Sequence, residues 1–366
     1  MSYSIFSLTN SESERSKSFM IKSSKYRNLV IDLMSKNKHN NLILNFLIYI
    51  CFLPFTLFVF IAMILLNRFE EKVIIFFPGI IEVILFKILK PLTKKDIFFD
   101  AFTSMYLTLV NDRGKISKKN PISKVLKWFD KIVFNLSDYQ FVETTEMKNY
   151  FQSEIGVNTS CTFVLPTARK ELEYTGKKII ENRVAFWGNF AVMHGVDYIV
   201  EAAKFLKEDN INFDLVGDGE NFLKIKEKID KENLSNITLH GFLPYSDDSS
   251  ENIFSIASKS KICLGTFSNS VKNNLVIPHK IIEALSMSKP VITSSTIHIQ
   301  NNLADFIEVV EPENAKKLAE KIKEIIYDEE KLKKMSVMGY EYFKSNFSDD
   351  SFHRRLSDII ESNLND

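Results

Sequence analysis

The sequence has few cysteines, and their positions exclude the usual cysteine-dependent architectures. Only Cys51, Cys161 and Cys263 occur in 366 residues, and no two of them have C-x-x-C spacing. An odd number of widely separated cysteines indicates neither a disulfide framework nor a zinc site. We therefore expect three buried thiols in a reducing, cytoplasmic environment.

No leader sequence is evident, and the net charge is small. The N-terminus, MSYSIFSLTNSE, has no basic region ahead of an apolar run, so no secretory signal peptide is expected. The formal net charge is +1, which argues against a general nucleic-acid-binding protein. No D-x-D motif that would clamp a metal ion is recognisable, and we expect no metal site.

The small net charge conceals two halves of opposite sign. Residues 1–183 contain 26 Lys and Arg against 17 Asp and Glu, a net charge of +9, whereas residues 184–366 contain 21 against 29, a net charge of −8. The composition, 25% charged and 45% apolar, is that of a globular protein. A chain of 366 residues predicts two domains, and their opposite charges indicate different functions.

One long apolar segment, residues 42–66, interrupts the basic half. It reads LILNFLIYICFLPFTLFVFIAMILL, and cations flank it on both sides. Such a segment is long enough to span a hydrocarbon core of about 30 Å. A spanning helix would, however, separate the strand-like runs within residues 1–41 from the rest of their sheet. Three interpretations stay open: a monotopic segment that dips into one leaflet, a true span, or an apolar helix buried under the sheet.

Strand-like and helix-like patterns alternate along the rest of the chain. In the first half, strands are expected at 72–79, 96–102, 139–147 and 161–166, with helices through residue 92, at 123–138 and at 147–155; a basic, polar connection precedes the second helix. After a polar linker at 167–183, strands are expected at 183–190, 211–219, 236–242, 261–267 and 290–295. Helices are expected at 196–206, 280–288, 315–326 and in the last forty residues. This α/β alternation predicts parallel, doubly wound sheets in two domains, 1–170 and 171–345, with a cleft between them and a C-terminal helix at 346–366.

The first candidate motif is W-G-N-F-A-V-M-H-G, residues 187–195, where a strand leads into a helix. Doubly wound folds bind ligands at the carboxyl ends of their strands. Free amides at such a helix start suit a phosphate, Gly195 allows close approach, and His194 could add a charge-assisted donor. A simple glycine-containing turn is the alternative. In the second motif, L-V-G-D-G-E at 215–220, a tight turn with positive φ is favoured over a cleft-lining loop.

The third motif, residues 267–293, is the most informative. A polar Ser/Asn loop leads to Pro278, which suits the first turn of a helix. Lys280 and Glu283 follow three residues apart and share one helix face. A carboxylate at that place can accept two sugar hydroxyls, while loop amides and the helix start can meet a diphosphate. A nucleotide needs both kinds of contact. A solvated glutamate is the alternative interpretation of Glu283.

Taken in order, these segments resemble the retaining glycosyltransferases of family 4, which have the GT-B architecture of two Rossmann-like domains facing a central cleft. The resemblance covers W-G-N-F…H-G-V-D-Y-I-V-E-A-A, F-D-L-V-G-D-G, I-T-L-H-G-F-L-P, I-C-L-G-T-F and I-P-H-K-I-I-E-A-L-S-M-S-K-P-V-I-T. More loosely, it extends to D-I-F-F-D-A-F-T-S-M-Y-L-T-L-V-N-D-R and F-V-E-T-T-E-M-K-N-Y-F in the first half.

The resemblance implies a donor-binding set of residues. Glu283 matches the second glutamate of the E-x7-E signature, which usually holds the nucleotide ribose, whereas the first would fall at Leu275. Positions that hold Arg and Lys in many relatives look like Asn189 and His194, and Ser288 occupies a usual glycine position. The implied donor-binding residues are Gly188, Asn189, His194, Gly195, Gly241, Phe242, Ser268, Asn269, Ser270, Ile277, Lys280 and Glu283.

On the acceptor side, the residue that is often a histidine in relatives looks like Asp100 here. Asp100 is expected to orient the acceptor or the donor sugar, or only to cap a turn. The Gly-rich loop expected after the first strand is not recognisable in SLTNSESE. The implied catalytic residues are Asp100, His194 and Lys280.

The resemblance implies retaining transfer of a sugar from a nucleotide-diphosphate sugar, without a metal or another cofactor. The basic half and its apolar segment suggest a saccharide or polyprenyl-linked acceptor at the inner face of the cell membrane, where cations attract anionic headgroups. Two rivals stay open, because half of the glutamate signature is missing. One is an inactive homologue that acts as a scaffold in glycan assembly, and the other is a sugar-nucleotide epimerase.

Overall fold

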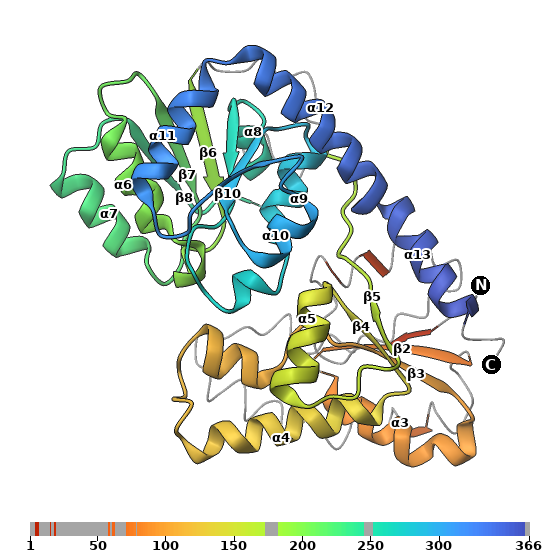
Figure 1. Cartoon of the computed structure of the whole chain (residues 1–366). Helices are drawn as coiled ribbons and strands as arrows, with labels where there is room; N and C mark the ends of the chain where they lie inside the picture. The colour runs from red at the N-terminus through yellow and green to blue at the C-terminus, as the bar shows by residue number, and fades with distance from the viewer. Residues whose placement is uncertain are drawn as a thin grey trace. The chain divides into compact units, whose positions relative to one another are not determined.

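The computed structural model describes residues 4–6, 15, 18–19, 58, 61–62, 71–77, 79–172, 182–244 and 252–362 of the chain. The chain divides into two compact units, each with its own parallel sheet (Figure 1). The first unit comprises residues 1–167 and 352–366, and the second comprises residues 168–351. The first unit is therefore discontinuous in sequence, whereas the second is one continuous stretch.

The sheet of the first unit has five parallel strands in the order β1-β2-β3-β4-β5. The strands are β1 (Ser4–Phe6), β2 (Lys72–Phe76), β3 (Asp96–Asp100), β4 (Tyr139–Val142) and β5 (Thr162–Val164). The helical elements are α3 (Ile80–Thr93), α4 (Pro121–Leu136) and α5 (Thr145–Tyr150), with π-helical turns η2 (Leu107–Asp112) and η3 (Phe151–Ile155). From β2 onward each strand pairs with the next along the chain, so right-handed crossovers place α3, α4 and α5 on one face of the sheet.

The end of the chain completes this unit. Phe19 packs against Phe76 of β2, Phe141 of β4 and Phe352, with ring centroids 4.9 to 5.8 Å apart. Phe352 belongs to the last helix, α13 (Asp349–Ser362). The Lys72 ammonium donates a hydrogen bond of 3.2 Å to the Ile360 carbonyl oxygen of the same helix. Residues from both ends of the sequence therefore meet in one apolar layer.

Two expectations in the first unit were wrong in detail. The strand expected at 139–147 ends at Val142, because the Thr144 hydroxyl accepts a hydrogen bond from the Met147 amide and caps α5. The polar connection expected before α4 contains the π-helical turn η2. Helix α4 itself begins where an Asn120 cap and Pro121 favour a first turn.

The second unit carries a six-stranded parallel sheet in the order β11-β10-β9-β6-β7-β8. Its strands are β6 (Arg183–Trp187), β7 (Asn212–Val216), β8 (Ile237–Gly241), β9 (Ile262–Leu264), β10 (Val291–Ser294) and β11 (Glu308–Val310). Its helices are α6 (Val196–Phe205), α7 (Phe222–Lys231), α8 (Ile253–Ala257), α9 (His279–Ser286), α10 (Ile297–Asn302), α11 (Ala315–Ile326) and α12 (Glu329–Asn346), with 3₁₀ turns η4 (Val192–His194) and η5 (Lys272–Asn274). The direction in which successive strands are added to the sheet reverses between β6 and β9, as in a doubly wound fold.

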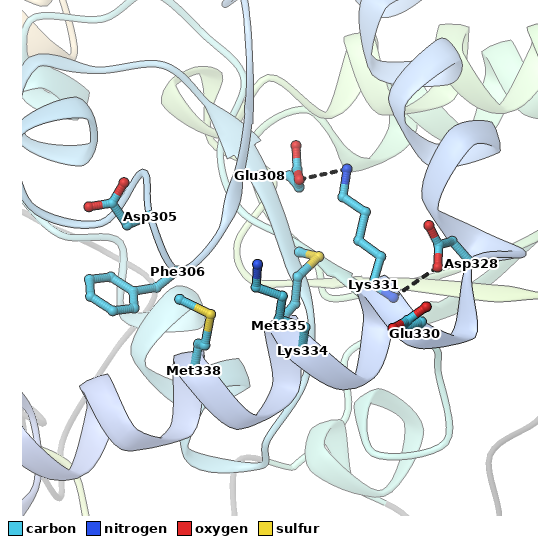
Figure 2. Close-up of a pocket in the computed structure, with 9 residues that line it drawn as sticks. All are labelled: Asp305, Phe306, Glu308, Asp328, Glu330, Lys331, Lys334, Met335 and Met338. Atoms are coloured by element: carbon cyan, nitrogen blue, oxygen red, sulfur yellow. Dashed lines mark hydrogen bonds and ion pairs between the residues drawn. The ribbon is translucent and has the colours of Figure 1, made fainter.

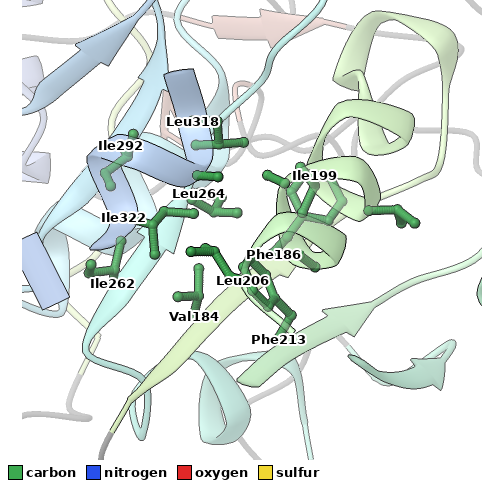
Figure 3. Close-up of a cluster of buried hydrophobic side chains, with 14 of the residues drawn as sticks. Val184, Phe186, Ile199, Leu206, Phe213, Ile262, Leu264, Ile292, Leu318 and Ile322 are labelled. Atoms are coloured by element: carbon green, nitrogen blue, oxygen red, sulfur yellow. The ribbon is translucent and has the colours of Figure 1, made fainter. Parts of the chain in front are cut away.

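One apolar cluster of the second unit lies between its sheet and the helices α6 and α11, and another includes residues of α8, α9 and α12. Figure 3 shows Val184 and Phe186 of β6 packed with Ile199 of α6 and with Leu318 and Ile322 of α11. These side chains are fully or almost fully removed from water, which makes apolar burial the main stabilising contribution to this unit. The alternation of strands and helices predicted from the sequence is confirmed here.

Two of the three cysteines lie in the described part of the chain. Cys263 is buried and burial raises its pKa to about 12, but Cys161 is exposed, so the expectation of a buried thiol was wrong there. Cys161 occupies the turn just before β5, where the chain lies at the surface. Cys51 and nearly all of residues 42–66 lie outside the described residues. Within the described part of the chain, no helix combines the length and the apolar character needed to cross a bilayer.

Candidate functional site

Three glycines follow or end adjacent strands at the carboxyl edge of the second sheet. The Gly188 amide donates to the Val216 carbonyl oxygen at 3.0 Å, and the Gly217 amide donates to the Gly241 carbonyl oxygen at 2.7 Å. Gly217 has a φ of +136°, and a Cβ built on it would lie 1.9 Å from the Gly188 carbonyl oxygen. The backbones after β6 and β7 therefore approach closely because side chains are missing between them. The favoured interpretation of the second motif as a positive-φ turn agrees with this geometry.

Gly188 also lies against two predicted catalytic side chains. A Cβ built on Gly188 would lie 3.3 Å from Cε1 of His194 and 3.4 Å from Nζ of Lys280. His194 comes from the turn after β6, and Lys280 comes from the first turn of α9, 86 positions later. The fold thus brings Gly188, His194 and Lys280 together, as expected for a single site.

Lys280 is a buried ammonium group. Its side chain is 6% exposed, and Nζ lies 5.0 Å from the ring centroid of Phe186. Among the described residues, no carboxylate lies within ion-pair distance of Nζ. Burial lowers the pKa of Lys280 to about 7, because the charged form loses its hydration. An anion placed beside this amine would favour the charged form.

His194 differs from the sequence-based expectation. Burial, followed by the nearby charge of Lys280, lowers its pKa to about 2, so the imidazole is neutral near pH 7. Its Nδ1 lies against the Asn189 carbonyl oxygen, which can only accept, so Nδ1 carries the proton. The charged donor expected at this position is therefore wrong. The remaining ring nitrogen, Nε2, is a neutral acceptor suited to a hydroxyl group.

The loop after β9 is attached to the His194 turn. The Ser268 hydroxyl and the Asn273 side-chain amide both donate to the Met193 carbonyl oxygen, at 2.6 and 2.7 Å. A Cβ built on Gly195 would lie 2.7 Å from the Ser268 amide nitrogen, so this close approach requires glycine. Asn273 also donates to the Ser268 carbonyl oxygen at 2.9 Å. These contacts fix the position of the first and third motifs relative to each other.

Not every amide of that loop points to an open site. The Asn269 amide donates to Oε1 of Glu313 at 3.2 Å, so the N–H expected to meet a diphosphate already has an acceptor. The Ser270 hydroxyl accepts a hydrogen bond of 3.1 Å from the Asn273 backbone amide, and this bond orders the turn. The role of this loop in the structure is mainly to shape the backbone around Gly195.

Glu283 is 1% exposed, and its carboxylate contacts Trp187 and Arg169. The Trp187 indole N–H donates to its Oε2 at 2.6 Å, and Nη1 of Arg169 lies 3.5 Å from its Oε1. The Arg169 guanidinium stacks 4.9 Å from the ring centroid of Phe254. No sequence pattern selects Arg169, which falls in the segment expected to be a linker. Access of a ribose to Glu283 would require one of these partners to move.

The four remaining predicted residues are Ile277, Gly241, Phe242 and Asp100. Ile277 is buried in the apolar cluster that contains Trp187, so it packs rather than presenting a polar contact. Gly241 ends β8 with open space beside it, and Phe242 is exposed. Asp100 belongs to the first unit, where it ends β3.

Asp100 forms an ion pair with Arg15. It accepts from Nε and Nη2 of Arg15 at 2.6 to 3.0 Å, and both side chains are almost completely buried. Burial raises the pKa of the Asp100 carboxyl, and the Arg15 guanidinium opposes that rise. Nη1 of Arg15 donates to the Leu165 carbonyl oxygen at 2.7 Å and to Thr167, which in turn donates to Glu143 at 2.8 Å. Arg15 therefore links Asp100 at the end of β3 to Leu165 after β5 and, through Thr167, to Glu143 after β4.

A hollow of about 390 Å³ lies elsewhere in the second unit. Figure 2 shows Asp305 and Phe306 on one side of it and Lys331, Met335 and Met338 of α12 on the other. Asp305 and Phe306 precede β11, whereas the glycine cluster, Gly188 and Gly217, follows β6 and β7. Because all strands are parallel, the hollow lies at the amino edge of the sheet, opposite the candidate site. In the part of the chain that the structure describes, no cluster of three metal-ligating side chains occurs.

The fold is that of known glycosyltransferases. HepE of Anabaena, solved with UDP-glucose, aligns with a TM-score of 0.65 over 83% of this chain and 81% of its own, at 12% identity. Sucrose-phosphate synthase of Thermosynechococcus elongatus aligns with a TM-score of 0.61 over 81% and 74%, at 14% identity. These likenesses define the chain as a GT-B protein with two Rossmann-like units.

Sequence similarity then narrows the class. Residues 168–342, which are almost the whole second unit, match the model of the family glycosyl transferases group 1. An uncharacterized glycosyltransferase of Methanocaldococcus jannaschii is 30% identical over 168 residues, and the match spans 43% of this chain and 42% of that relative. The likeness to the family glycosyl transferases group 1 therefore covers the second unit, and the chain matches less than half of the length of the curated relative.

Proposed function

We propose that this protein is a retaining glycosyltransferase of family 4 that moves a sugar from a nucleotide-diphosphate sugar to an acceptor. The observation that carries the proposal is Lys280, a buried amine without a nearby carboxylate among the described residues, set beside Gly188. A buried charge is unfavourable unless an opposite charge compensates it. The diphosphate of a donor would supply that charge at the carboxyl edge of the sheet.

The neighbouring groups suit the same donor. The Lys280 ammonium and the amides beside Gly188 would stabilise the negative charge that develops on the leaving diphosphate. Nε2 of neutral His194 would accept a hydrogen bond from a sugar hydroxyl. Glu283 would hold the ribose once its contact with Trp187 or Arg169 opens. Since HepE has been solved with UDP-glucose, a uridine donor is the first probe to use.

The acceptor and the location follow from the basic first half. We propose a saccharide or polyprenyl-linked acceptor in surface glycan synthesis, met by a cytoplasmic protein at the inner face of the membrane. We further propose hexosyl transfer that needs neither a metal ion nor another cofactor. Transfer in the presence of excess EDTA tests that statement, and loss of activity that Mg²⁺ restores would refute it.

The decisive experiment compares two buried lysines of the same unit. Lys289 is 7% exposed and donates to the Ser260 carbonyl oxygen at 3.0 Å, beyond the C-terminal end of α9 and away from the glycine cluster. Lys280→Met is expected to weaken binding of UDP-glucose or another accepted donor roughly 100-fold, since hydrogen bonds to charged groups contribute about 1.5–3 kcal/mol. Lys289→Met, the matched control, is expected to bind normally. Equal donor affinity in the two variants would remove Lys280 from the site.

A panel of nucleotide sugars separates the proposal from its rivals. With membrane lipid extract as acceptor, a transferase releases the nucleoside diphosphate. A scaffold protein binds and releases nothing with any donor. An epimerase changes the sugar without an acceptor and leaves the nucleotide attached.

A further inference from the structure

The outward face of α4 carries apolar side chains where a helix of this position is expected to be polar. Val125 is exposed, and Trp128 is 63% exposed one turn later. The opposite side of the helix is already used, because Val133 and Phe134 are buried. A helix packed on a sheet normally turns polar residues to water. An exposed tryptophan beside an exposed valine therefore indicates a partner for this face.

The same region is strongly basic. Between Arg113 and Phe129 the sequence contains six cations and no acid: Arg113, Lys115, Lys118, Lys119, Lys124 and Lys127. All of them except Lys127 are exposed. Asp112 directly precedes this run, so residues 112–129 carry a net charge of +5. Asp130 turns inward and accepts from the amides of Met105 and Tyr106, and Glu154 lies 3.8 Å from Lys127.

Helix α3 extends the apolar part of this surface. It lies beside α4 on the same face of the sheet (Figure 1) and exposes Ile88 and Leu92 one turn apart. Two of its cations, Lys87 and Lys90, are paired with Asp138, so its contribution is mainly apolar. The exposed side chains of α3 and α4, with the basic loop 113–120 before α4, are called the α3–α4 face below.

We propose that the α3–α4 face binds an anionic lipid membrane, with Trp128 at the level of the headgroups. Tryptophan favours the membrane interface, where its ring is apolar and its N–H is polar. Lysines beside it attract anionic lipids at about 1 kcal/mol each. A nucleic acid would use the cations but leave Val125, Ile88 and Leu92 exposed to water. A membrane uses both kinds of side chain.

The α3–α4 face contains no residue of the segment 42–66, and its test needs no sugar donor. It deepens the proposed location at the membrane, and a failure of the transferase proposal would leave it standing. The chain contains only two tryptophans, and Trp187 is 2% exposed. Quenching by aqueous acrylamide therefore reports almost entirely on Trp128.

The experiment titrates the full-length protein with vesicles and follows tryptophan emission. With vesicles of phosphatidylglycerol and phosphatidylcholine, the emission of Trp128 is expected to shift to shorter wavelength and to lose most of its acrylamide quenching. Brominated lipid should quench it. Vesicles of phosphatidylcholine alone are expected to produce a much smaller change. Trp128→Phe should abolish the signal.

Two pairs of variants test the parts of the face. Replacing Lys118, Lys119 and Lys124 by Gln is expected to raise the lipid concentration at half-maximal shift roughly fivefold per lysine. The control replaces Lys207, Lys226 and Lys333, exposed on the second unit, and should behave as the parent protein. Val125→Asp should weaken the response, whereas Leu223→Asp, at an equally exposed position of α7, should not.

Three results would overturn the proposal. The protein could sediment with vesicles while Trp128 stays fully quenched by acrylamide, which would assign binding to another segment. The shift could be equal with neutral and anionic vesicles, which would remove the role of the lysines. It could also occur with an oligonucleotide or with rising protein concentration alone, which would identify a different partner.

Discussion

Each unit places a buried cation at the carboxyl edge of its sheet, and the two cations have opposite surroundings. Arg15 in the first unit uses three nitrogens on Asp100, Leu165 and Thr167. Lys280 in the second unit touches an aromatic ring and lies beside a glycine, without a carboxylate at ion-pair distance among the described residues. Arg15 is thus satisfied by its own chain, whereas Lys280 has no carboxylate counter-ion among the described residues.

The difference shows that burial of a cation at a strand end does not by itself identify a binding site. What distinguishes Lys280 is the combination of a missing counter-ion and the glycines around it. Arg15 and Asp100 have the geometry of a structural brace between strands. On this basis Asp100 is a weaker candidate for catalysis than Lys280, although both were selected from the sequence.

The largest effect is expected from removing the buried ion pair between Asp100 and Arg15. Asp100→Ala leaves the Arg15 charge buried without its partner and is expected to lower the free energy of unfolding by about 3–5 kcal/mol. Urea denaturation measures this value. Glu154→Ala, which removes an exposed partner of Lys127, should cost less than about 1 kcal/mol. Similar losses in the two variants would show that the Arg15 pair is not a structural brace.

The second largest effect is expected from adding a side chain where the backbones of Gly217 and Gly188 approach each other. Gly217→Ala places a Cβ 1.9 Å from the Gly188 carbonyl oxygen and is expected to cost about 2–3 kcal/mol or more. It should also raise the donor KM, because the backbone beside Lys280 must move. Gly241→Ala, with a φ of +68° but open space around it, should cost about 1 kcal/mol. Thermal unfolding and initial rates test the pair, and an unchanged KM in Gly217→Ala would separate this contact from the donor site.

A smaller effect concerns pH, and it distinguishes Lys280 from Arg15. The pKa of Lys280 is about 7 in the folded chain and 10.5 in its ordinary state, so the unfolded chain binds more protons above pH 7. Stability should therefore rise by about 1 kcal/mol per unit between pH 7.5 and 9, and Lys280→Met should lose that slope. Affinity for a nucleotide-diphosphate sugar should fall over the same range. Parallel pH profiles in the parent and Lys280→Met would contradict the assignment.

The smallest effect is at Ser288, which follows α9. Its φ is +54°, a region that glycine adopts without strain. Ser288→Gly is expected to raise the free energy of unfolding by about 0.5–1 kcal/mol, since a side chain there is unfavourable. Donor affinity should not change. Chemical denaturation and donor titration check both statements, and a destabilised variant would indicate that the Ser288 side chain makes a needed contact.

Local patterns were enough to predict most of the second unit. Apolar runs gave β6, β7 and β10, and the amphipathic repeat of residues 315–326 gave α11, because each pattern depends on neighbours along the chain. The strand expected at 139–147 was too long because Thr144 has strand propensity but acts as a helix cap. A hydroxyl in that position is compatible with both structures.

Partnerships across long sequence separations could not be predicted. Arg15 meets Asp100 over 85 positions, and Trp187 meets Glu283 over 96. Nothing near His194 in the sequence reveals that burial and Lys280 keep it neutral. The residue types of the candidate site were readable, but their protonation and partners depend on the folded chain.

The discontinuity of the first unit has a consequence for biosynthesis. A ribosome releases residues 1–167 first, then the whole second unit, and only then residues 352–366. Phe352 and the Ile360 carbonyl, which contact Phe19 and Lys72, thus emerge only after the second unit. The second unit has all its strands before the first unit can close its apolar layer. During translation the first unit, whose synthesis begins earlier, can therefore be completed only after the second unit.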